Sequence, residues 1–415
     1  MLLKQTGEDF NMTVSATCAD GTITPNFQMD DITLSVNDIA PALSNPVSLG
    51  ISTIDISDAD NGSHDESTQS ISEVGVFSIT AAPNNLYFTE TISPATSASI
   101  GRFTPDYYQL GDINNGELSG GNPFVYTGQM QTTTSSLGQI SYLTAPEFTI
   151  TAKSEDGNTT LNYTGDFIKL LATSISRDTP TQDASQLGKD ATNKVDLNAT
   201  LNNPIFAEYS PGVLKYQYNS SDHFVYTRNA NSLIAPFTSD IELLINSVTD
   251  SDNIQATDLD SDTSNGILTL QPLGLEIRFG RWIMENSYGP EISDIRIPMS
   301  IQYWNASYFV INNEDSFTSF NATDANITDN QLSPATTPNI VGSGLFTSGE
   351  TSELTVESPG ADVRGSITIE QNVPSWLKYD WSVIDESYDE NPSANATFGL
   401  YRGNDRIIYR QEVFD

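Results

Sequence analysis

The sequence has little cysteine, little histidine and few basic residues. Among 415 residues it has one cysteine, two histidines, and 17 lysines and arginines against 54 aspartates and glutamates. The only thiol, Cys18, cannot form a disulfide within the chain, so no internal disulfide framework supports the fold. No neighbouring residue is of a kind that would activate it, and we expect Cys18 to be a small buried residue.

The other scarce residues exclude further classes of function. With only His64 and His223, a histidine-based catalytic triad or a multi-histidine zinc site is poorly supported. A formal net charge of −37 argues against nucleic-acid binding, which needs clustered lysine and arginine, and against docking on anionic membranes. The charge predicts solubility and self-repulsion, and the alternative is a surface that collects divalent cations.

Long apolar runs are also lacking. No stretch of about 18 apolar residues occurs, so we predict no transmembrane helix and no membrane insertion. Met1-Leu2-Leu3-Lys4 is too short for a signal peptide, and we interpret it as an added start at a boundary within a longer protein.

The pattern that is present is that of β-strands. Ile295, Ile297, Met299, Ile301 and Tyr303 alternate with polar residues, which predicts a strand with one apolar face. Turn signals separate many such short strands, namely Asp20-Gly21, Gly120-Gly121, Asp156-Gly157, Asn265-Gly266 and Ser358-Pro359-Gly360. Short strands with close-spaced turns are typical of β-sandwiches.

A repeat divides the chain. The segment from Met12 to Ile32 matches the segment from Phe148 to Ile168 without a gap, at an offset of 136 residues. A later and weaker match sets Gly75-Val76-Phe77 against Gly212-Val213-Leu214, which requires one inserted residue. An offset this large indicates a duplicated domain, because solenoid repeats have periods of 20–50 residues.

The repeat gives the predicted organisation. We expect an all-β protein with two tandem Ig-like antiparallel β-sandwich modules at residues 1–103 and 104–263. A larger, jelly-roll-like β-sandwich is expected at 264–415, which contains all four tryptophans. The first module is expected to be truncated, because it has little room for the strand-like Phe124–Gly128 that precedes the second copy.

Two acidic clusters are candidate calcium sites, since Ca²⁺ takes six to eight oxygen ligands. The clusters are Asp55, Asp58, Asp60, Asp65 and Glu66, and Asp250, Asp252, Asp258, Asp260 and Asp262. The second has the first half of an EF-hand spacing but lacks its glycine and its closing glutamate, where Thr263 and Thr269 stand. The alternative is that both clusters are solvated loops between strands.

Other candidate sites are less specific. Trp282, Trp304, Trp376 and Trp381 could form a platform that stacks on sugars, or they could be core residues of a β-sandwich. A glycosidase-type pair of carboxylates is possible in principle, but aspartate and glutamate are so frequent that no pair stands out.

Several ordered motifs resemble one bacterial family. They are Gly101–Asp106, Phe124–Gln129, Arg278–Glu291, Phe309–Asp315, Ser375–Trp381 and Pro392–Tyr409. Their order is similar to that in the C-terminal region of the MshQ family, large proteins linked to the mannose-sensitive haemagglutinin (MSHA) type IV pilus of Gram-negative bacteria. The resemblance implies a secreted or surface-exposed, pilus-associated protein with an adhesive or tip role, and it brings no catalytic residue.

Three hypotheses follow. The first is a non-enzymatic module array of an MSHA-type pilus, located at the cell surface, whose partners are pilus subunits or other modules of the same protein. The second is a lectin-like carbohydrate-binding protein that uses the tryptophans on surface glycans. The third is a polysaccharide-active hydrolase, which needs two carboxylates about 5–10 Å apart in a cleft.

Overall fold

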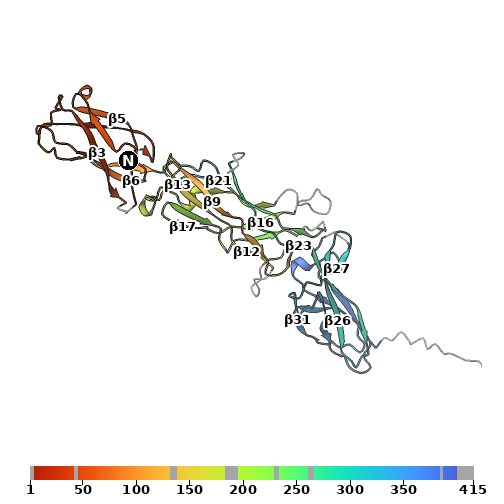
Figure 1. Ribbon diagram of the computed structural model, residues 1–415. Coiled ribbons are helices and arrows are strands. Elements are labelled where there is room, and N and C mark those ends of the chain that lie inside the picture. Colours follow the sequence, from red (N-terminus) through yellow and green to blue (C-terminus); the bar gives the residue numbers. More distant parts are fainter. Residues whose placement is uncertain are drawn as a thin grey trace, which may run out of the picture.

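The computed structural model describes residues 4–41, 45–130, 138–182, 195–228, 233–259, 266–383 and 387–399. Within these residues the chain is built from strands, with five single-turn 3₁₀ helices at Asp58–Asp60, Gly165–Phe167, Ala172–Ser174, Ala322–Asp324 and Ser375–Leu377. Three β-sandwich modules follow one another in an elongated arrangement (Figure 1). The predicted all-β fold of tandem sandwich modules is confirmed.

The first module contains strands β1 to β8. One sheet has the order β1-β8-β6-β3-β4, with β7 beside β6, and a two-stranded sheet joins β2 to β5. The strands are β1 (Lys4–Gln5), β2 (Phe10–Ser15), β3 (Met29–Ala40), β4 (Thr53–Ile56), β5 (Ser63–Gln69), β6 (Gly75–Pro83), β7 (Ala95–Thr96) and β8 (Ile100–Thr104).

The middle module contains strands β9 to β23 in four sheets, with the orders β17-β18-β13-β9, β10-β12-β19-β16, β11-β23-β20 and β14-β21-β15, where β22 also pairs with β21. The strands are β9 (Tyr107–Asn114), β10 (Glu117–Ser119), β11 (Phe124–Tyr126), β12 (Ile140–Thr144), β13 (Glu147–Lys153), β14 (Ile175–Arg177), β15 (Thr181–Gln182), β16 (Leu197–Thr200), β17 (Ile205–Ser210), β18 (Val213–Gln217), β19 (His223–Tyr226), β20 (Phe237–Thr238), β21 (Ile241–Val248), β22 (Leu268–Leu270) and β23 (Glu276–Arg278).

The last module contains strands β24 to β34, in sheets of order β24-β26-β32-β30 with β27 beside β26, β25-β34-β33-β29, and β28-β31. The strands are β24 (Gly280–Met284), β25 (Ser287–Gly289), β26 (Ile295–Trp304), β27 (Phe309–Ile311), β28 (Ser319–Asn321), β29 (Ala325–Asn330), β30 (Ile340–Val341), β31 (Ser343–Leu345), β32 (Glu350–Val356), β33 (Gly365–Gln371) and β34 (Ser393–Phe398).

A few parallel pairs interrupt the antiparallel pattern. β1 pairs with β8, β11 with β23, and β25 with β34, all in parallel. Parallel neighbours need a long connection between them. Each of these pairs joins an early strand of its module to a late one, so the module itself is the connection.

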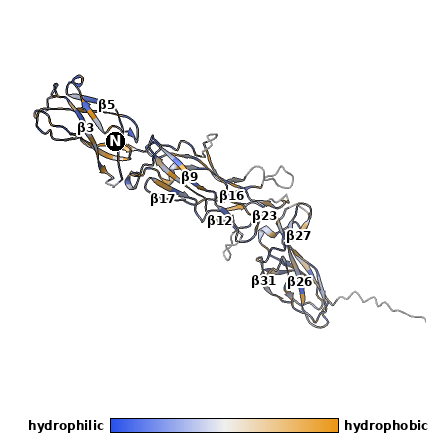
Figure 2. Cartoon of the chain, in the orientation of Figure 1, coloured by the Kyte–Doolittle hydropathy of each residue, from blue (hydrophilic) through white to orange (hydrophobic). Residues whose placement is uncertain are grey.

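Apolar side chains line the inner faces of the sheets in each module. The alternation predicted for residues 295–303 is seen in β26, where Ile295, Ile297, Met299 and Ile301 are each at most 4% exposed. Figure 2 shows apolar strand residues throughout the three modules. Because burial of apolar area is the main favourable term in folding, each module has its own source of stability.

The sequence repeat corresponds to a repeated hairpin. In the first copy the Thr24 N–H donates to the Ala16 carbonyl, and in the second copy Thr160 donates to Ala152 in the same way. The tips need a left-handed backbone, and Gly21 and Gly157 supply it with φ of 86° and 78°. The 136-residue offset therefore relates β2 in the first module to β13 in the middle one.

A third hairpin of the same form occurs where the sequence showed only an acidic stretch. The Ala256 N–H donates to the Val248 carbonyl, and the Asn253 N–H donates to the Asp250 carbonyl at the tip. Asn253 has φ of 66°, so asparagine takes the place that glycine has in the other two copies. This third copy was not predicted from the sequence, because it shares the backbone hydrogen bonds of the other two hairpins and not their residues.

One expectation about the repeat is wrong. The weaker match of Gly75 with Gly212 does not hold, because the backbone places Gly62 opposite Gly212. Ala16 donates to the Gly62 carbonyl as Ala152 donates to that of Gly212. Both glycines have φ near 77° (78° and 76°), and a Cβ would lie 2.1 Å from the Thr24 carbonyl oxygen or 2.5 Å from that of Thr160.

Cys18 is exposed rather than buried. It lies at the tip of the first hairpin, where its carbonyl accepts from the Gly21 N–H.

Strand pairing shows that the middle module extends beyond residue 263. β22 and β23 pair with strands of the middle module, although the sequence analysis assigned residues after 263 to the last one. It stays a prediction that the chain folds as independent units whose boundaries lie at residues 103 and 263. No helix in the described part of the chain is long and apolar enough to span a membrane.

Candidate functional site: the joints between the modules

We call the contacts between the first and middle modules the upstream joint. Glu73 of the first module is 5% exposed, and its two carboxylate oxygens accept the N–H groups of Leu161 and Asn162, both at 3.0 Å. Burial raises the pKa of Glu73, and the two N–H donors oppose this shift. The next residue, Val74, is 1% exposed and packs into the core of the middle module.

The hairpin tips of the middle module also contact the first module. The Glu155 N–H in the second hairpin donates to the Thr6 carbonyl at 2.9 Å. At the adjacent Gly7, which has φ of 89°, a Cβ would lie 2.9 Å from the Cβ of Glu155. The close approach of the two backbones therefore depends on glycine at this position.

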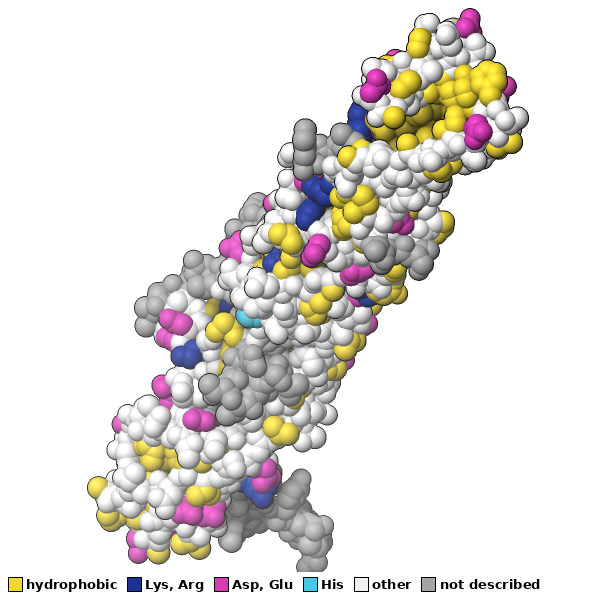
Figure 3. All heavy atoms as spheres, turned by 90° about the vertical axis from the view of Figure 1, so that its left-hand side faces the viewer, with side chains coloured by type: hydrophobic (Ala, Val, Ile, Leu, Met, Phe, Trp, Pro, Cys, Tyr) yellow, Lys and Arg dark blue, Asp and Glu magenta, His cyan; other side chains and the backbone are white. Residues whose placement is uncertain are grey.

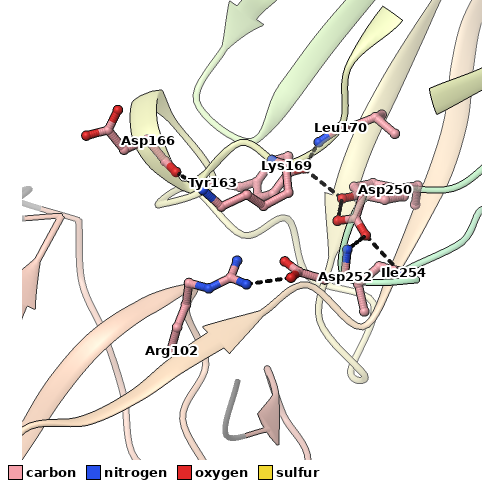
Figure 4. A network of polar contacts seen from close by, with 9 residues as sticks. Arg102, Tyr163, Asp166, Lys169, Leu170, Asp250, Asp252 and Ile254 are labelled. Carbon is pink, nitrogen blue, oxygen red and sulfur yellow. Dashed lines mark hydrogen bonds and ion pairs between the residues drawn. The ribbon is translucent and has the colours of Figure 1, made fainter. Parts of the chain in front are cut away.

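The third hairpin holds an ion pair across the same joint. Arg102 of β8 donates to Asp252 at 2.6 Å, as Figure 4 shows. Asp250, two residues earlier, accepts from the N–H groups of Asp252 and Ile254 and from the Tyr108 hydroxyl at 2.6 Å. Asp250 thus fixes the tip that carries Asp252.

We call the contacts between the middle and last modules the downstream joint. Phe124 and Tyr126 of β11 belong to the middle module by position but lie in the core of the last module, at most 1% exposed. The Tyr126 hydroxyl donates to Asp315 at 2.7 Å and accepts from the Asn312 side-chain amide at 2.7 Å. Burial and the nearby Asp315 carboxylate raise the pKa of Tyr126 well above its ordinary value.

Arg228 ties the middle module to the last one. Its guanidinium donates to the carbonyls of Trp376 at 2.9 Å, Gly280 at 2.9 Å and Lys378 at 2.7 Å. It lies 3.7 Å from the centre of the Phe279 ring, a favourable cation–π distance. Burial lowers the pKa of Arg228 to about 9, so the side chain is still charged at neutral pH.

Two further arginines lie among aromatic rings, Arg278 at this joint and Arg281 within the last module. Arg278 is 4.3 Å from the ring centre of Phe124 and 4.6 Å from that of Tyr303, and it pairs with Glu276 and Glu314. Arg281 lies 3.6 Å from the ring centre of Phe309. Burial lowers the pKa of Arg281. In an acidic chain with few cations, three arginines, Arg102, Arg228 and Arg278, therefore make contacts across the two joints.

The four tryptophans are packed side chains. Trp282 is 1% exposed in the core of the last module, edge-on to Phe346. Trp304, Trp376 and Trp381 are half-buried, and Trp304 packs against Phe309. The structure does not bring the four rings together on one exposed face, so sugar binding by them stays a prediction.

The aspartates proposed for calcium are used in protein contacts. Asp55 accepts from the Asp31 N–H, Asp58 from the Gln28 amide, and Asp60 from the Ser57 N–H. The described residues contain no group of three or more His, Cys, Asp or Glu side chains that could hold a metal ion.

The remaining residues of the two clusters either have a partner within the protein or lie outside the described residues. Asp65 accepts from the Thr13 hydroxyl, Glu66 accepts from Thr68, and Asp258 also has a contact within the protein. Asp260 and Asp262 lie outside the described residues. Calcium binding stays a prediction.

Comparison with known proteins gives the family. The model of the fourth domain of DUF6701 matches residues 278–413, and the model of its third domain matches residues 73–271. This chain belongs to the DUF6701 family. The third-domain match begins at Glu73, the residue that enters the upstream joint. No curated protein matches the chain.

Two solved structures are similar to this DUF6701 chain at low identity. One is described as "FdeC, a Novel Broadly Conserved Escherichia coli Adhesin Eliciting Protection against Urinary Tract Infections", with 13% identity, 95% of this chain and 94% of that chain covered, and a TM-score of 0.33. The other is the Yersinia pseudotuberculosis adhesin InvE, with 11% identity, 70% and 61% covered, and a TM-score of 0.18.

The residues of the two joints were not predicted from the sequence. Glu73, Tyr126 and Arg228 are single residues whose partners lie 52 to 189 positions away in the chain. The only available signal was the scarcity of arginine in an acidic chain, because a rare cation that is buried must have specific partners.

Proposed function

We propose that this chain is a non-enzymatic stalk of a surface-exposed, pilus-associated protein of a Gram-negative bacterium, which holds an adhesive part away from the cell. The observation that carries the proposal is the pair of interlocked joints. At each joint, side chains of one module lie in the core of the next, as Val74 does upstream and Tyr126 does downstream.

Interlocking favours a fixed direction between modules. A module that rotated about the upstream joint would expose Val74 and leave the Leu161 and Asn162 N–H groups without their acceptor. An unpaired buried polar group costs about 1–3 kcal/mol, so each joint resists bending. The elongated arrangement then transmits position and force along the chain (Figure 1).

The use of the buried acidic side chains supports a non-catalytic role. Glu73, Asp250 and Asp315 are at most 5% exposed, and each accepts hydrogen bonds that hold a joint together. A catalytic carboxylate must instead reach a substrate in a cleft.

The link to the MSHA pilus rests on the ordered motifs that resemble the MshQ family, among them Arg278–Glu291 and Ser375–Trp381. We propose pilus subunits or other modules of the same protein as its partners. Surface glycans would be bound by whatever the stalk carries.

Adhesion of intact bacteria tests the proposal. We expect a strain with Arg228→Ala to adhere less than the parent strain while displaying the protein at the same level by immunogold labelling. The matched control is Arg296→Ala, which removes an arginine whose side chain is 64% exposed. Equal adhesion by the parent strain and a strain without the protein would contradict a role in adhesion.

A second measurement separates a stalk from a binding or hydrolytic module. The purified 415-residue chain is applied to a glycan array and incubated with surface polysaccharide. The stalk proposal expects neither retention nor release of reducing ends. Glycan binding that is lost in Trp381→Ala would favour the lectin-like hypothesis, and hydrolysis would favour the enzyme.

A further inference from the structure

The first module lacks a strand that the middle module has. In the middle module β13 is paired on both edges, with β18 on one side and β9 on the other. The equivalent strand β2 pairs with β5, and within the described residues no strand lies along its other edge. Among the residues of the first module that the structure describes, β9 has no counterpart.

Side chains of β2 are less buried than the equivalent side chains of β13. Phe148, Ile150 and Ala152 on the inward face of β13 are at most 1% exposed. Their equivalents at the 136-residue offset, Met12, Val14 and Ala16, are only half-buried. The same positions of the repeat are thus covered in one module and uncovered in the other.

A cavity lies beside β2, on the face that β9 covers in the middle module. It has a volume of about 350 Å³ and is lined by apolar residues of both sheets, including Val14, Ala16, Phe27, Ile32 and Tyr87. Figure 3 shows a hollow lined by hydrophobic side chains at the end of the molecule formed by the first module. Beside it, Phe88 packs edge-on to Tyr87 and is 83% exposed.

The middle module shows what fills the equivalent space. Tyr108 of β9 is 0% exposed and stands opposite Ala152, the equivalent of Ala16. Its ring is 5.8 Å from that of Tyr163, the equivalent of Phe27. The cavity of the first module therefore corresponds to the position of the Tyr108 ring.

We propose that the first module is completed by an added β-strand, which pairs antiparallel with β2 and places an aromatic side chain in this cavity. The added strand would resemble β9, with large apolar residues at the positions of Tyr108 and Leu110. Main-chain hydrogen bonds give such an added strand its affinity, and the pocket gives it specificity.

The donor to which we commit is a segment that precedes residue 1 in a longer form of the same polypeptide. The argument is chain order, because β9 precedes β13 by several strands in the middle module, and the same order places its counterpart ahead of β2. A strand from a second copy of the chain is the competing source.

A fusion tests this proposal with the complete chain. Residues 105–116, which contain β9, are joined through a flexible linker to Met1, and hydrogen exchange of the β2 amides is followed by mass spectrometry. We expect exchange in Phe10–Ser15 to slow by about tenfold or more, independently of protein concentration. A fusion whose β2 amides exchange as fast as in the parent chain would overturn the proposal.

Two matched controls give the test its specificity. In the fused strand, Tyr108→Asp should abolish the protection, because a carboxylate cannot enter an apolar cavity without a partner. In the host, Val14→Glu should abolish it, and Asn11→Glu, on the exposed face of the same strand, should not. Because the fused-strand variant leaves the host unchanged, misfolding of Val14→Glu would not obscure the result.

The concentration series separates the two donors. Protection of β2 in the unfused chain that appears only as a dimer forms would show a second copy as the donor, and would overturn the assignment to a preceding segment.

Discussion

The two joints hold neighbouring modules by different chemistry. The upstream joint depends on carboxylates, with the buried Glu73 and the Arg102–Asp252 ion pair, whose side chains are 23% and 16% exposed. The downstream joint places Arg228 and Arg278 against aromatic rings. Charges that solvent reaches are weakened by salt, whereas buried cations among rings are screened much less. We therefore expect the upstream joint to respond to salt and to pH in the acidic to neutral range, and the downstream joint to respond less to both.

Arg228→Ala is expected to have the largest effect. The change leaves three carbonyl groups without their donor and removes the contact with Phe279, at a cost of about 3–5 kcal/mol in the free energy of unfolding. All four tryptophans lie in the last module, so their fluorescence during urea unfolding reports this joint. Arg296→Ala is the control, with an expected cost under about 1 kcal/mol. Equal costs for the two variants would contradict the role given to Arg228.

Glu73→Ala is expected to have the next largest effect. It leaves the N–H groups of Leu161 and Asn162 without an acceptor, at a cost of about 2–3 kcal/mol. Faster hydrogen exchange at these two amides, with unchanged exchange in β26 of the last module, is the expected result. Unchanged exchange at Leu161 and Asn162 would show that the carboxylate does not hold the joint.

The pH dependence of the upstream joint follows from the raised pKa of Glu73. A carboxyl whose pKa is raised on folding binds its proton more tightly in the folded state. Its contribution to stability is therefore fully present below the ordinary carboxyl pKa of about 4.3 and is lost as the pH rises through the raised value. Urea unfolding at a series of pH values should show the parent chain losing stability relative to Glu73→Gln over this range. A relative gain with rising pH would contradict the assignment.

Tyr126→Phe is expected to have a smaller effect on the downstream joint. The ring stays in the core of the last module, but Asp315 loses a donor and Asn312 loses an acceptor. We expect a loss of about 1–2 kcal/mol in the transition followed by tryptophan fluorescence. Tyr288→Phe is the matched control, because this residue is 73% exposed and should cost nothing measurable.

Arg102→Ala is expected to have the smallest effect and to show the salt response. A partly exposed ion pair contributes under about 1 kcal/mol. The coupling between Arg102→Ala and Asp252→Ala in a double-mutant cycle should shrink as salt is raised towards 1 M. Coupling that is independent of salt would remove the distinction between the joints.

The sequence predicted the fold well because strands and turns leave local patterns. The period of two in residues 295–303 and the glycines of the hairpin tips were readable, since each depends on neighbouring residues. The match of Gly75 with Gly212 failed because a backbone contact, the carbonyl of Thr24 or Thr160, decides where glycine is required. The hairpin tip at Asn253 was not predicted either, because asparagine stands there in place of glycine and only the backbone hydrogen bonds are shared.

The candidate sites could not be predicted in this way. The spacing of Asp250 and Asp252 in the sequence suggested calcium ligands. In the structure their partners are Tyr108 and Arg102, which lie 142 and 150 residues away in the chain. Only the assembled joint shows that these carboxylates bind a hydroxyl and a guanidinium. The truncation of the first module was expected, yet its consequence, the uncovered cavity beside β2, needed the comparison with β13.

Electron microscopy of single particles of the 415-residue chain tests the central claim most directly, through the angle between modules at each joint. Two interlocked joints predict elongated particles with a narrow distribution of angles, in which the upstream distribution broadens in high salt and the downstream one does not. Particles that bend freely at both joints, or that fold back into a compact shape, would contradict a stalk.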